Sequence, residues 1–291
     1  MQIVTEARNS LKNILFATDF SMRSNLALPY AISIAGKYGS KIFAAHVVDH
    51  PLPIITSQLD TAQIPPTQAE QEAEVGLASL ETRWFGIPHE ILLRKGDIWT
   101  ELSEIINTKG IGLIVIGTHG RTGNKKLLMG SIAEKIYRQA LCPVLTVGPA
   151  VSGGSDSIVD LRQILCPTDF SAESLAALPY AISLARENKA HLHLLHIAIG
   201  FPEPEQAAIV KSKIRKLVPS NANLFAEPKV LVEYGAPAQR ILELAEEFGT
   251  DLIVLGVKRI PTHFEQSKQY RMATAYKVVS QAICPVLTVR G

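Results

Sequence analysis

The sequence predicts an α/β protein built from two similar doubly wound domains. Three observations support this: a long internal repeat, short apolar runs that alternate with helical patterns inside each repeat, and an ordinary globular composition. The chain has 291 residues, of which 47% are hydrophobic and 19% are charged. A chain of this length and composition contains enough apolar material for two buried cores.

The repeat is visible by direct alignment of the two halves. Residues 11–35 align without a gap on residues 161–185, and 16 of the 25 aligned positions are identical. The segment Cys-Pro-Val-Leu-Thr-Val at 142–147 recurs at 284–289. A glycine- and serine-rich stretch between the repeats is typical of a flexible linker. We therefore expect one domain at residues 1–148, a linker at 149–160 and a second domain at 161–291.

Within the first repeat, apolar runs predict strands and apolar spacings of three and four predict helices. The expected strands are residues 14–17, 42–48, 91–94, 113–116 and 144–147, and the expected helices are 26–35, 67–85, 99–108 and 132–140. Strands that are apolar throughout, each followed by a helix, indicate a parallel sheet covered on both faces. We expect five parallel strands in the order 3-2-1-4-5 in each domain, which is a Rossmann-like arrangement.

Proline breaks the helical pattern at one matching position in each half. Pro29 and Pro179 fall inside the first predicted helix of their repeats. A proline there removes a hydrogen bond and clashes with the preceding turn, at a cost of about 3 kcal/mol. We expect one kinked helix in each half.

Charge and cysteine content exclude several classes of protein. The net charge is +2, which gives no support to a nucleic-acid partner. The longest apolar run, residues 111–116, is too short to insert across a membrane, and the N-terminus has no signal-peptide pattern. The three cysteines form no Cys-x-x-Cys pair and are interpreted as small buried residues. The expected location is cytoplasmic.

A glycine-containing loop follows the fourth predicted strand. It begins at Gly117, contains Gly120, and ends at Gly130 and Ser131, where a helix starts. Glycine permits a close approach of the backbone to a ligand, and a helix N-terminus favours an anion. The spacing matches neither a P-loop nor a dinucleotide fingerprint. A structural alternative is that Ser131 and Glu134 form a capping box that does no more than start the helix.

The strand order brings this loop next to an acidic residue. In an open α/β sheet, ligands bind beyond the carboxyl ends of the strands, at the point where the strand order reverses. Thr18 and Asp19 follow the first strand, and Gly117 ends the fourth, so both ends face one crevice. Asp19 could accept hydrogen bonds from a ligand, hold a magnesium ion, or only bind local backbone N–H groups.

These features together resemble a tandem universal stress protein. The resemblance covers nearly all of both halves and rests on Asp19-Phe20-Ser21, His46-Val47, Gly96-Asp97 and the pattern G-x2-G-x9-G-[ST] that begins at Gly117. The last pattern is the ATP-binding signature of that family. The resemblance implies that Asp19 and the backbone at Val47 contact adenine, and that Ala17, beside Thr18, and Gly117 line the ribose side. It also implies that Gly120, Gly130 and Ser131 take the phosphates of ATP, or of AMP or ADP, with or without Mg²⁺.

The second half departs from this signature. It keeps Asp169, but Arg259 stands where Gly120 is expected, Met272-Ala273 replaces Gly130-Ser131, and the loop is three residues longer. A side chain at these positions would block the approach of a phosphate to the backbone. The expected ligand is therefore one nucleotide per chain, held by the N-terminal half.

No other group of residues demands catalysis. His191 and His193 share one face of a predicted strand but have no evident third metal ligand, and His46 and His196 are interpreted as packing or loop-bonding residues. We expect no catalytic residue and no metal site. The preferred function is a nucleotide-dependent regulatory protein of the stress response; the alternatives are a slow ATPase that uses the same loop and a purely structural dimerisation or scaffold protein.

The last strand of each half, at 144–147 and 286–289, is expected at a sheet edge, where open backbone groups favour pairing. The resemblance implies that such strands mediate dimerisation. We therefore expect the two strands to pair within one chain as an intramolecular pseudo-dimer. Homodimerisation and an unidentified protein partner are further expectations.

Overall fold

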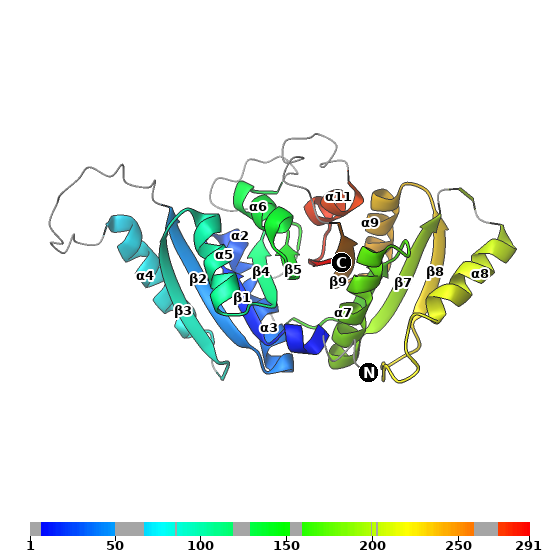
Figure 1. Ribbon diagram of the computed structural model, residues 1–291, viewed down its shortest axis with the longest axis horizontal. Coiled ribbons are helices and arrows are strands. Elements are labelled where there is room, and N and C mark those ends of the chain that lie inside the picture. Colours follow the sequence, from blue (N-terminus) through cyan, green and yellow to red (C-terminus); the bar gives the residue numbers. More distant parts are fainter. Residues whose placement is uncertain are drawn as a thin grey trace.

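A single ten-stranded sheet forms the centre of the molecule (Figure 1). The computed structural model describes residues 7–49, 67–84, 86–118, 129–151, 159–198, 200–201, 203–258 and 273–291. The N-terminal half, up to residue 150, contains the strands β1 (Asn13–Ala17), β2 (Lys41–Asp49), β3 (His89–Gly96), β4 (Leu113–Gly117) and β5 (Val144–Val147). The C-terminal half contains β6 (Gln163–Pro167), β7 (His191–Ala198), β8 (Lys229–Tyr234), β9 (Leu252–Val257) and β10 (Val286–Arg290).

The strand order confirms the expected topology in both halves. It runs β3-β2-β1-β4-β5-β10-β9-β6-β7-β8, which is the order 3-2-1-4-5 followed by its mirror sequence 5-4-1-2-3. Neighbouring strands are parallel within each half. The two halves meet where β5 pairs with β10 in antiparallel orientation, so the expected pairing of the last strands within one chain is confirmed.

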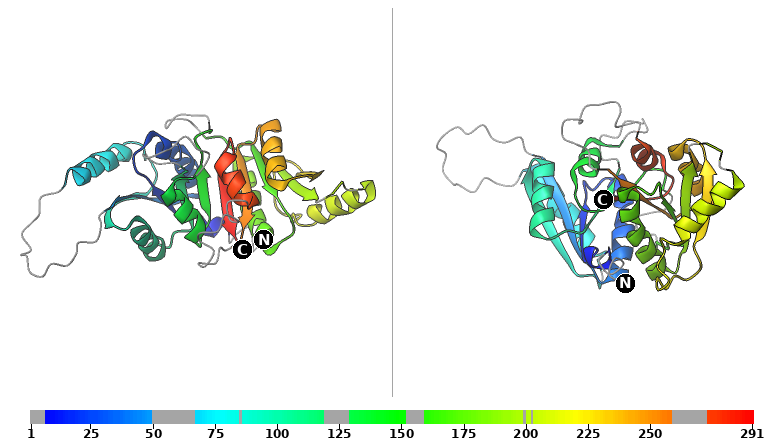
Figure 2. Two further views of the ribbon diagram at one scale, coloured as in Figure 1. Left: turned by 90° about the horizontal axis from the view of Figure 1, so that it is seen from above. Right: turned by 45° about the vertical axis from the view of Figure 1, so that its right-hand side comes forward.

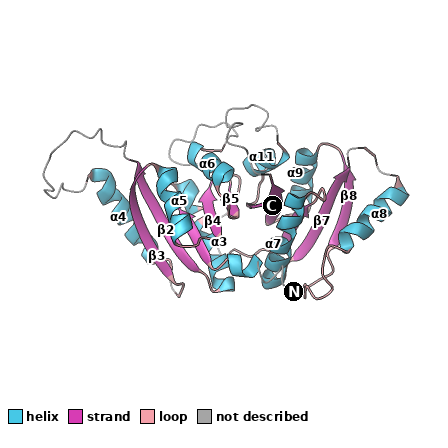
Figure 3. Cartoon of the chain, viewed as in Figure 1, coloured by secondary structure: helices cyan, strands magenta, loops and turns pink. Residues whose placement is uncertain are grey.

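Helices cover both faces of this sheet, as the apolar strands predict (Figure 3). The N-terminal half has α2 (Met22–Asn25), α3 (Leu28–Tyr38), α4 (Gln68–Glu81), α5 (Ile98–Thr108) and α6 (Ser131–Gln139). The C-terminal half has α7 (Ala172–Asn188), α8 (Pro204–Arg215), α9 (Pro237–Glu247) and α11 (Thr274–Gln281). The helices α4 and α8 lie at opposite ends of the molecule in every view (Figure 2).

Each face of the sheet carries one hydrophobic core that includes residues of both halves. The first core packs α3, α4, α7 and α8 on one face, and the second packs α5, α6, α9 and α11 on the other. Leu145 and Leu287 belong to the first core, whereas Val144 and Val286 belong to the second. Because successive side chains of a strand point to opposite faces, β5 and β10 join both cores across the junction.

The expectation of one kinked helix in each half is wrong for the N-terminal half. There the helix is interrupted after Asn25, and Pro29 lies in the first turn of α3, a position that needs no backbone N–H donor. In the C-terminal half α7 continues through Pro179. Asparagine has a lower helix propensity than the Leu175 found at the matching position, which favours the interruption in the first half only.

No helix among the described residues is long and apolar enough to cross a membrane.

Candidate functional site

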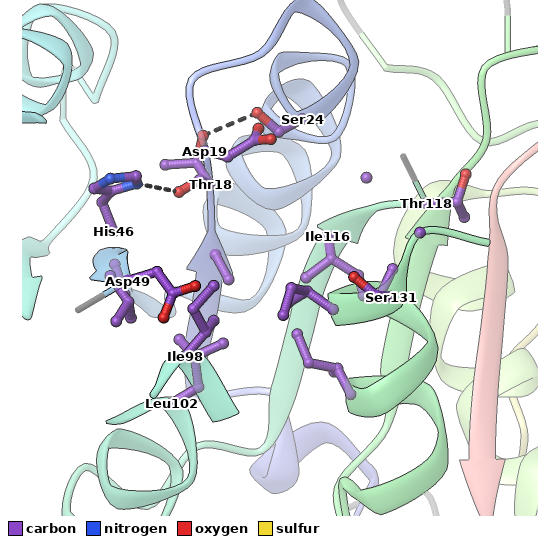
Figure 4. A pocket seen from close by; sticks show the side chains of 18 residues that line it. Thr18, Asp19, Ser24, His46, Asp49, Ile98, Leu102, Ile116, Thr118 and Ser131 are labelled. Carbon is purple, nitrogen blue, oxygen red and sulfur yellow. Dashed lines mark hydrogen bonds between the residues drawn. The ribbon is translucent and has the colours of Figure 1, made fainter. Parts of the chain in front are cut away.

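A pocket of about 410 Å³ opens at the carboxyl edge of the sheet in the N-terminal half. It lies beyond the ends of β1 and β4, where the chain connections leave toward opposite faces of the sheet, so the topology positions it. Its floor is apolar and consists of Ile98 and Leu102 of α5, Ile116 of β4, and Ala133 and Ile136 of α6. Polar side chains that also line it are those of Thr18, Asp19, Ser24, His46, Asp49, Thr118 and Ser131 (Figure 4).

The turn after β1 is held by side-chain hydrogen bonds. The Thr18 hydroxyl lies 3.0 Å from the hydroxyl of Ser24 and accepts from the backbone N–H of Phe20 at 3.0 Å. Phe20 has a positive φ of 60°, which few residues other than glycine adopt. The Nδ1 atom of His46 lies 2.8 Å from the carbonyl oxygen of Thr18, and the imidazole packs against the Phe20 ring. Since the carbonyl must accept, Nδ1 carries the hydrogen.

Asp19 lies on the wall of the pocket opposite the start of α6 (Figure 4). Its Oδ1 atom accepts a hydrogen bond from the Ser21 backbone N–H at 3.0 Å, and Ser21 in turn caps α2. The local backbone bond considered for this carboxylate is therefore present. The bond also fixes the orientation of a negatively charged group that lines the pocket.

The same turn recurs after β6 in the C-terminal half. The carbonyl of Thr168 lies 2.8 Å from His196 Nδ1, the hydroxyls of Thr168 and Ser174 are 3.1 Å apart, and Asp169 accepts from the Ser171 N–H at 3.0 Å. These contacts agree with the interpretation of both strand-end histidines as loop-bonding residues. Although partial burial would raise the pKa of Asp169, hydrogen bonds from Ser171, Ser174 and the backbone together outweigh it and lower that pKa below its usual value.

Gly117, at the end of β4, lines the pocket and also has a packing role. A Cβ atom on this residue would lie 2.8 Å from the carbonyl oxygen of Arg23 and 3.0 Å from the Cα atom of Ser24. The missing side chain therefore lets α2 approach β4 closely. Gly256 of β9 faces Glu173 in the same manner, so this packing requirement exists in both halves.

The first turn of α6 forms the wall that faces Asp19. Gly130 is the N-cap residue, with φ −61° and ψ 153°, and no side chain of the described residues caps the helix. The Ser131–Glu134 capping box suggested by the sequence is wrong, because Ser131 is already the first helical residue. Instead the Gly130 N–H donates to the Thr118 carbonyl at 2.7 Å. The first N–H groups of a helix lack partners inside the helix, so this end favours an anion.

Helix α5 supports the pocket floor. Asp97 caps it by accepting from the Thr100 N–H at 2.9 Å and the Thr100 hydroxyl at 2.8 Å. These hydrogen bonds hold the pKa of Asp97 below its usual value, with a smaller effect from Lys135. Gly96, just before the cap, has a φ of +138°, which favours glycine. This geometry gives the Gly96-Asp97 motif a structural role beneath the pocket.

All of the predicted site residues that the structure describes lie around one pocket. Seven of them line this pocket: Ala17, Thr18, Asp19, Val47, Gly117, Gly130 and Ser131. Gly120 lies outside the described residues. Asp49, which belongs to none of the predicted motifs, also lines the pocket with its carboxylate (Figure 4). The signal was available, because Asp49 lies two residues after Val47 on the same strand and therefore on the same face.

A smaller pocket of about 190 Å³ occupies the matching place in the C-terminal half. Its lining residues include Asp169, Pro237, Lys258, Thr274 and Ala275. The predicted loop substitutions Arg259 and Met272 lie outside the described residues. Ala273 is the N-cap of α11, whereas Ser131, its counterpart in the sequence, is the first residue of α6. The two halves therefore differ where the second wall of the pocket begins.

The remaining candidates have structural contacts. His193 is buried, lies 3.0 Å from Gln163 Oε1 and packs against Phe248, and burial lowers its pKa. No group of three or more potential metal ligands occurs among the described residues. Burial raises the pKa of Cys142 to about 11 and the pKa values of Cys166 and Cys284 to about 12, so these thiols are poor nucleophiles.

Comparison with known proteins gives consistent matches over the whole chain. The model of the universal stress protein family matches residues 10–148 and again residues 161–290. A universal stress protein of Methanocaldococcus jannaschii is 32% identical over 148 residues, which cover 50% of this chain and 86% of that protein. A universal stress protein of Mycolicibacterium smegmatis is 30% identical over 154 residues, which cover 49% of this chain and 48% of that protein.

A solved structure matches both halves at once. The crystal structure of a universal stress protein from Archaeoglobus fulgidus superposes with a TM-score of 0.74 at 20% sequence identity. The superposition covers 96% of this chain and 98% of that chain. At this level of identity the likeness concerns the fold, including the arrangement of two repeats.

Proposed function

This chain belongs to the universal stress protein family, and from that premise we propose that the pocket of its N-terminal half binds an adenine nucleotide. The preferred ligand is ATP, with AMP and ADP as related occupants. We further propose that the bound nucleotide regulates the association of this protein with itself or with a protein partner during stress. The second half then serves as the other half of an intramolecular pseudo-dimer.

One observation carries the proposal: a single pocket combines three surfaces that a nucleotide needs. Its apolar floor suits a flat base, since ligand pockets are mainly apolar with a few placed polar groups. The Asp19 carboxylate on one wall can accept hydrogen bonds from an amine or a hydroxyl. The first turn of α6 on the facing wall suits phosphate oxygens.

The proposed roles follow this arrangement. Asp19 and the backbone at Val47 would contact adenine, Ala17 and Gly117 would border the ribose, and Gly130 and Ser131 would receive the phosphates. Gly120 is proposed for the phosphates on its sequence position alone. Asp19 and Asp49 supply the carboxylate oxygens that Mg²⁺ prefers, should the nucleotide enter with a metal.

A regulatory role is favoured over efficient hydrolysis. Catalysis of phosphoryl transfer needs an oriented nucleophile and concentrated positive charge around the transferred group. Among the described residues that line the pocket there is no lysine or arginine. A slow ATPase that uses the same loop remains the second candidate, because a carboxylate such as that of Asp19 could orient a water molecule.

The decisive experiment is to identify what the protein carries. Freshly purified full-length protein is denatured, and the released small molecules are separated and quantified against the protein concentration. We expect an adenine nucleotide, or, if the protein purifies empty, saturable ATP binding by calorimetry. If the denatured protein releases no nucleotide, and calorimetry detects no binding of ATP, ADP or AMP, only the scaffold function is left. Turnover of added ATP at about 10 per second, the median value for enzymes, would overturn the regulatory role.

A further inference from the structure

Arg290, the last residue of β10, reaches across the junction between the halves. Its Nε atom donates to the carbonyl oxygen of Ala140 at 2.7 Å, and a terminal guanidinium nitrogen donates to the carbonyl of Tyr137. The other terminal nitrogen donates to the carbonyl of Lys258 at 2.9 Å, just after β9. One side chain of the C-terminal half therefore holds two carbonyls at the end of α6.

These two carbonyls are among the groups that a helix leaves unsatisfied at its C-terminus. Helix α6 ends at Gln139, and Ala140 is its C-cap residue. A cation there satisfies the carbonyls and interacts favourably with the helix dipole. Because α6 has only nine residues, its packing and its end contacts must hold it in place, since short helices have little stability of their own.

The opposite end of the same helix forms the phosphate wall of the proposed pocket. Ser131, Ile132, Ala133 and Ile136 all line it, so they extend over more than one turn of α6. A rigid displacement of the helix at Arg290 would therefore move the pocket wall directly. The distance involved is short, since nine residues span about 14 Å at 1.5 Å per residue.

No described residue of the first repeat makes the matching contact with the end of α11. Gly148 occupies the position of Arg290 in the first repeat, because Val147 matches Val289. A Cβ atom on Gly148 would lie 3.6 Å from the carbonyl oxygen of Ala282, the C-cap residue of α11. The geometry would thus admit a side chain at the end of α11, yet only α6 receives an arginine.

We propose that Arg290 is a positioning residue for the N-terminal pocket: by holding the C-terminal end of α6, it orients the helix turn that faces the ligand. This inference rests on the proposed nucleotide function and adds that a residue of one half orients a wall of the pocket in the other half. It also makes Lys258 and the end of α6 neighbours through one guanidinium group.

The test uses three variants of the full chain: one that loses the bonds from Arg290 to α6, one that loses a different bond across the junction, and one that restores a cation at position 290. Arg290→Met keeps the apolar part of the side chain and removes the guanidinium. Thr288→Val is the matched control, because it removes the buried bond from the Thr288 hydroxyl to the Val144 carbonyl at 3.2 Å without touching α6. Arg290→Lys restores a cation and at most part of the hydrogen bonding.

Two measurements are made on each protein. Hydrogen exchange without nucleotide reports the protection of the α6 amides, and calorimetry reports the affinity for ATP. We expect Arg290→Met to speed α6 exchange and weaken ATP binding, each by about three- to tenfold, the range of a helix-terminus charge interaction. We expect Arg290→Lys to fall between this variant and wild type, and Thr288→Val to stay within about twofold of wild type in both measurements.

The outcomes separate this inference from the proposed function. If wild-type protein binds no nucleotide, the proposed function fails, and unchanged α6 exchange in Arg290→Met would independently remove the positioning role. If wild type binds ATP and Arg290→Met binds it equally well, Arg290 does not position the pocket, whatever the exchange data show. Equal losses in Arg290→Met and Thr288→Val would mean a general loosening of the junction and would also overturn the inference.

Discussion

Leu145 and Leu287 lie opposite each other in the antiparallel ladder at the centre of the ten-stranded sheet. Both are almost completely buried, and both belong to the same hydrophobic core. They are repeat-related residues, so the sheet continues through the junction by pairing a strand with its own counterpart. The two halves consequently share cores on both faces of the sheet, which implies that they unfold together.

Leu287→Ala tests this shared stability. Removing a buried leucine side chain leaves a cavity, and we expect the free energy of unfolding to fall by about 2–5 kcal/mol. Calorimetry should show one transition whose midpoint decreases as a whole. Ile283→Ala, at a 45%-exposed position of the same terminal segment, is the control and should change stability by about 0.5 kcal/mol or less. Two separable transitions, with only one of them shifted, would show that the halves are independent.

Gly130→Val tests the phosphate wall. Gly130 has φ −61° and ψ 153°, a conformation that valine also adopts, so the substitution introduces no backbone strain. We expect its side chain to keep phosphates from the start of α6, and ATP binding to disappear in a calorimetric titration while the protein stays folded by circular dichroism. Gly130→Ala, with a single added methyl group, should give an intermediate affinity. Unchanged affinity in Gly130→Val would place the phosphate site elsewhere.

Asp19→Asn tests the acidic wall. The asparagine side chain retains an oxygen that can accept from the Ser21 N–H, so the turn should persist while the negative charge is lost. Hydrogen bonds to charged groups are the stronger ones, and we expect ATP affinity to fall by about tenfold to a hundredfold. Asp169→Asn makes the same change in the second half and should leave ATP affinity as it is. Equal effects of the two variants would contradict a single functional site.

Sequence reasoning predicted the features that depend on local pattern and topology. The strand order followed from apolar strands separated by helices, and the position of the pocket followed from that order together with Asp19 and Gly117. The pairing of the last strands followed from their expected place at a sheet edge together with the dimerisation that the family resemblance implies. The parallel sheet and the place of the pocket depend on periodicity and on the rules for doubly wound sheets, whereas the pairing of the two halves depends also on the family resemblance.

What the sequence could not show depends on contacts between distant segments. Arg290 contacts Tyr137 and Ala140, which lie about 150 positions earlier in the chain, and no sequence pattern predicts a contact over that separation. The glycine at 117 was interpreted through its closeness to a ligand, although the close approach of α2 also requires it. The helix is interrupted before Pro29 in the first half only, where Asn25 has a lower helix propensity than Leu175. Because both repeats contain the proline, the proline itself does not predict this difference.

Alkaline pH should destabilise the protein through its buried thiols. Burial raises the pKa of Cys166 from 9.0 to about 12, because the thiolate would be desolvated. Below about pH 9 the thiol is protonated in both states, whereas above it the unfolded chain loses a proton that the folded chain keeps. The free energy of unfolding should therefore fall by up to about 1.4 kcal/mol per pH unit for this group between about pH 9 and pH 12.

Urea unfolding at a series of pH values measures this slope. Cys166→Ala should give a flatter decrease between about pH 9 and pH 10.5, because one proton fewer is released on unfolding. The decrease that remains should reflect the other groups whose pKa values burial raises, which are Cys142, Cys284, Tyr30 and Tyr38. Identical slopes for wild type and Cys166→Ala would show that the Cys166 thiol does not contribute.

The last prediction concerns the number of ligands: we expect one nucleotide per chain, bound by the N-terminal half. The second pocket measures about 190 Å³ against about 410 Å³ for the first, so it offers less than half the space. Lys258 lines the smaller pocket and could still attract an anion, but through a side chain rather than through a helix turn that begins at a glycine. Calorimetry of the full chain with ATP should give a stoichiometry near one, and Gly130→Val should abolish the entire signal while Asp169→Asn preserves it. Two sites in the wild type, of which Gly130→Val abolishes one and Asp169→Asn weakens the other, would mean that the second half binds nucleotide without the glycine signature.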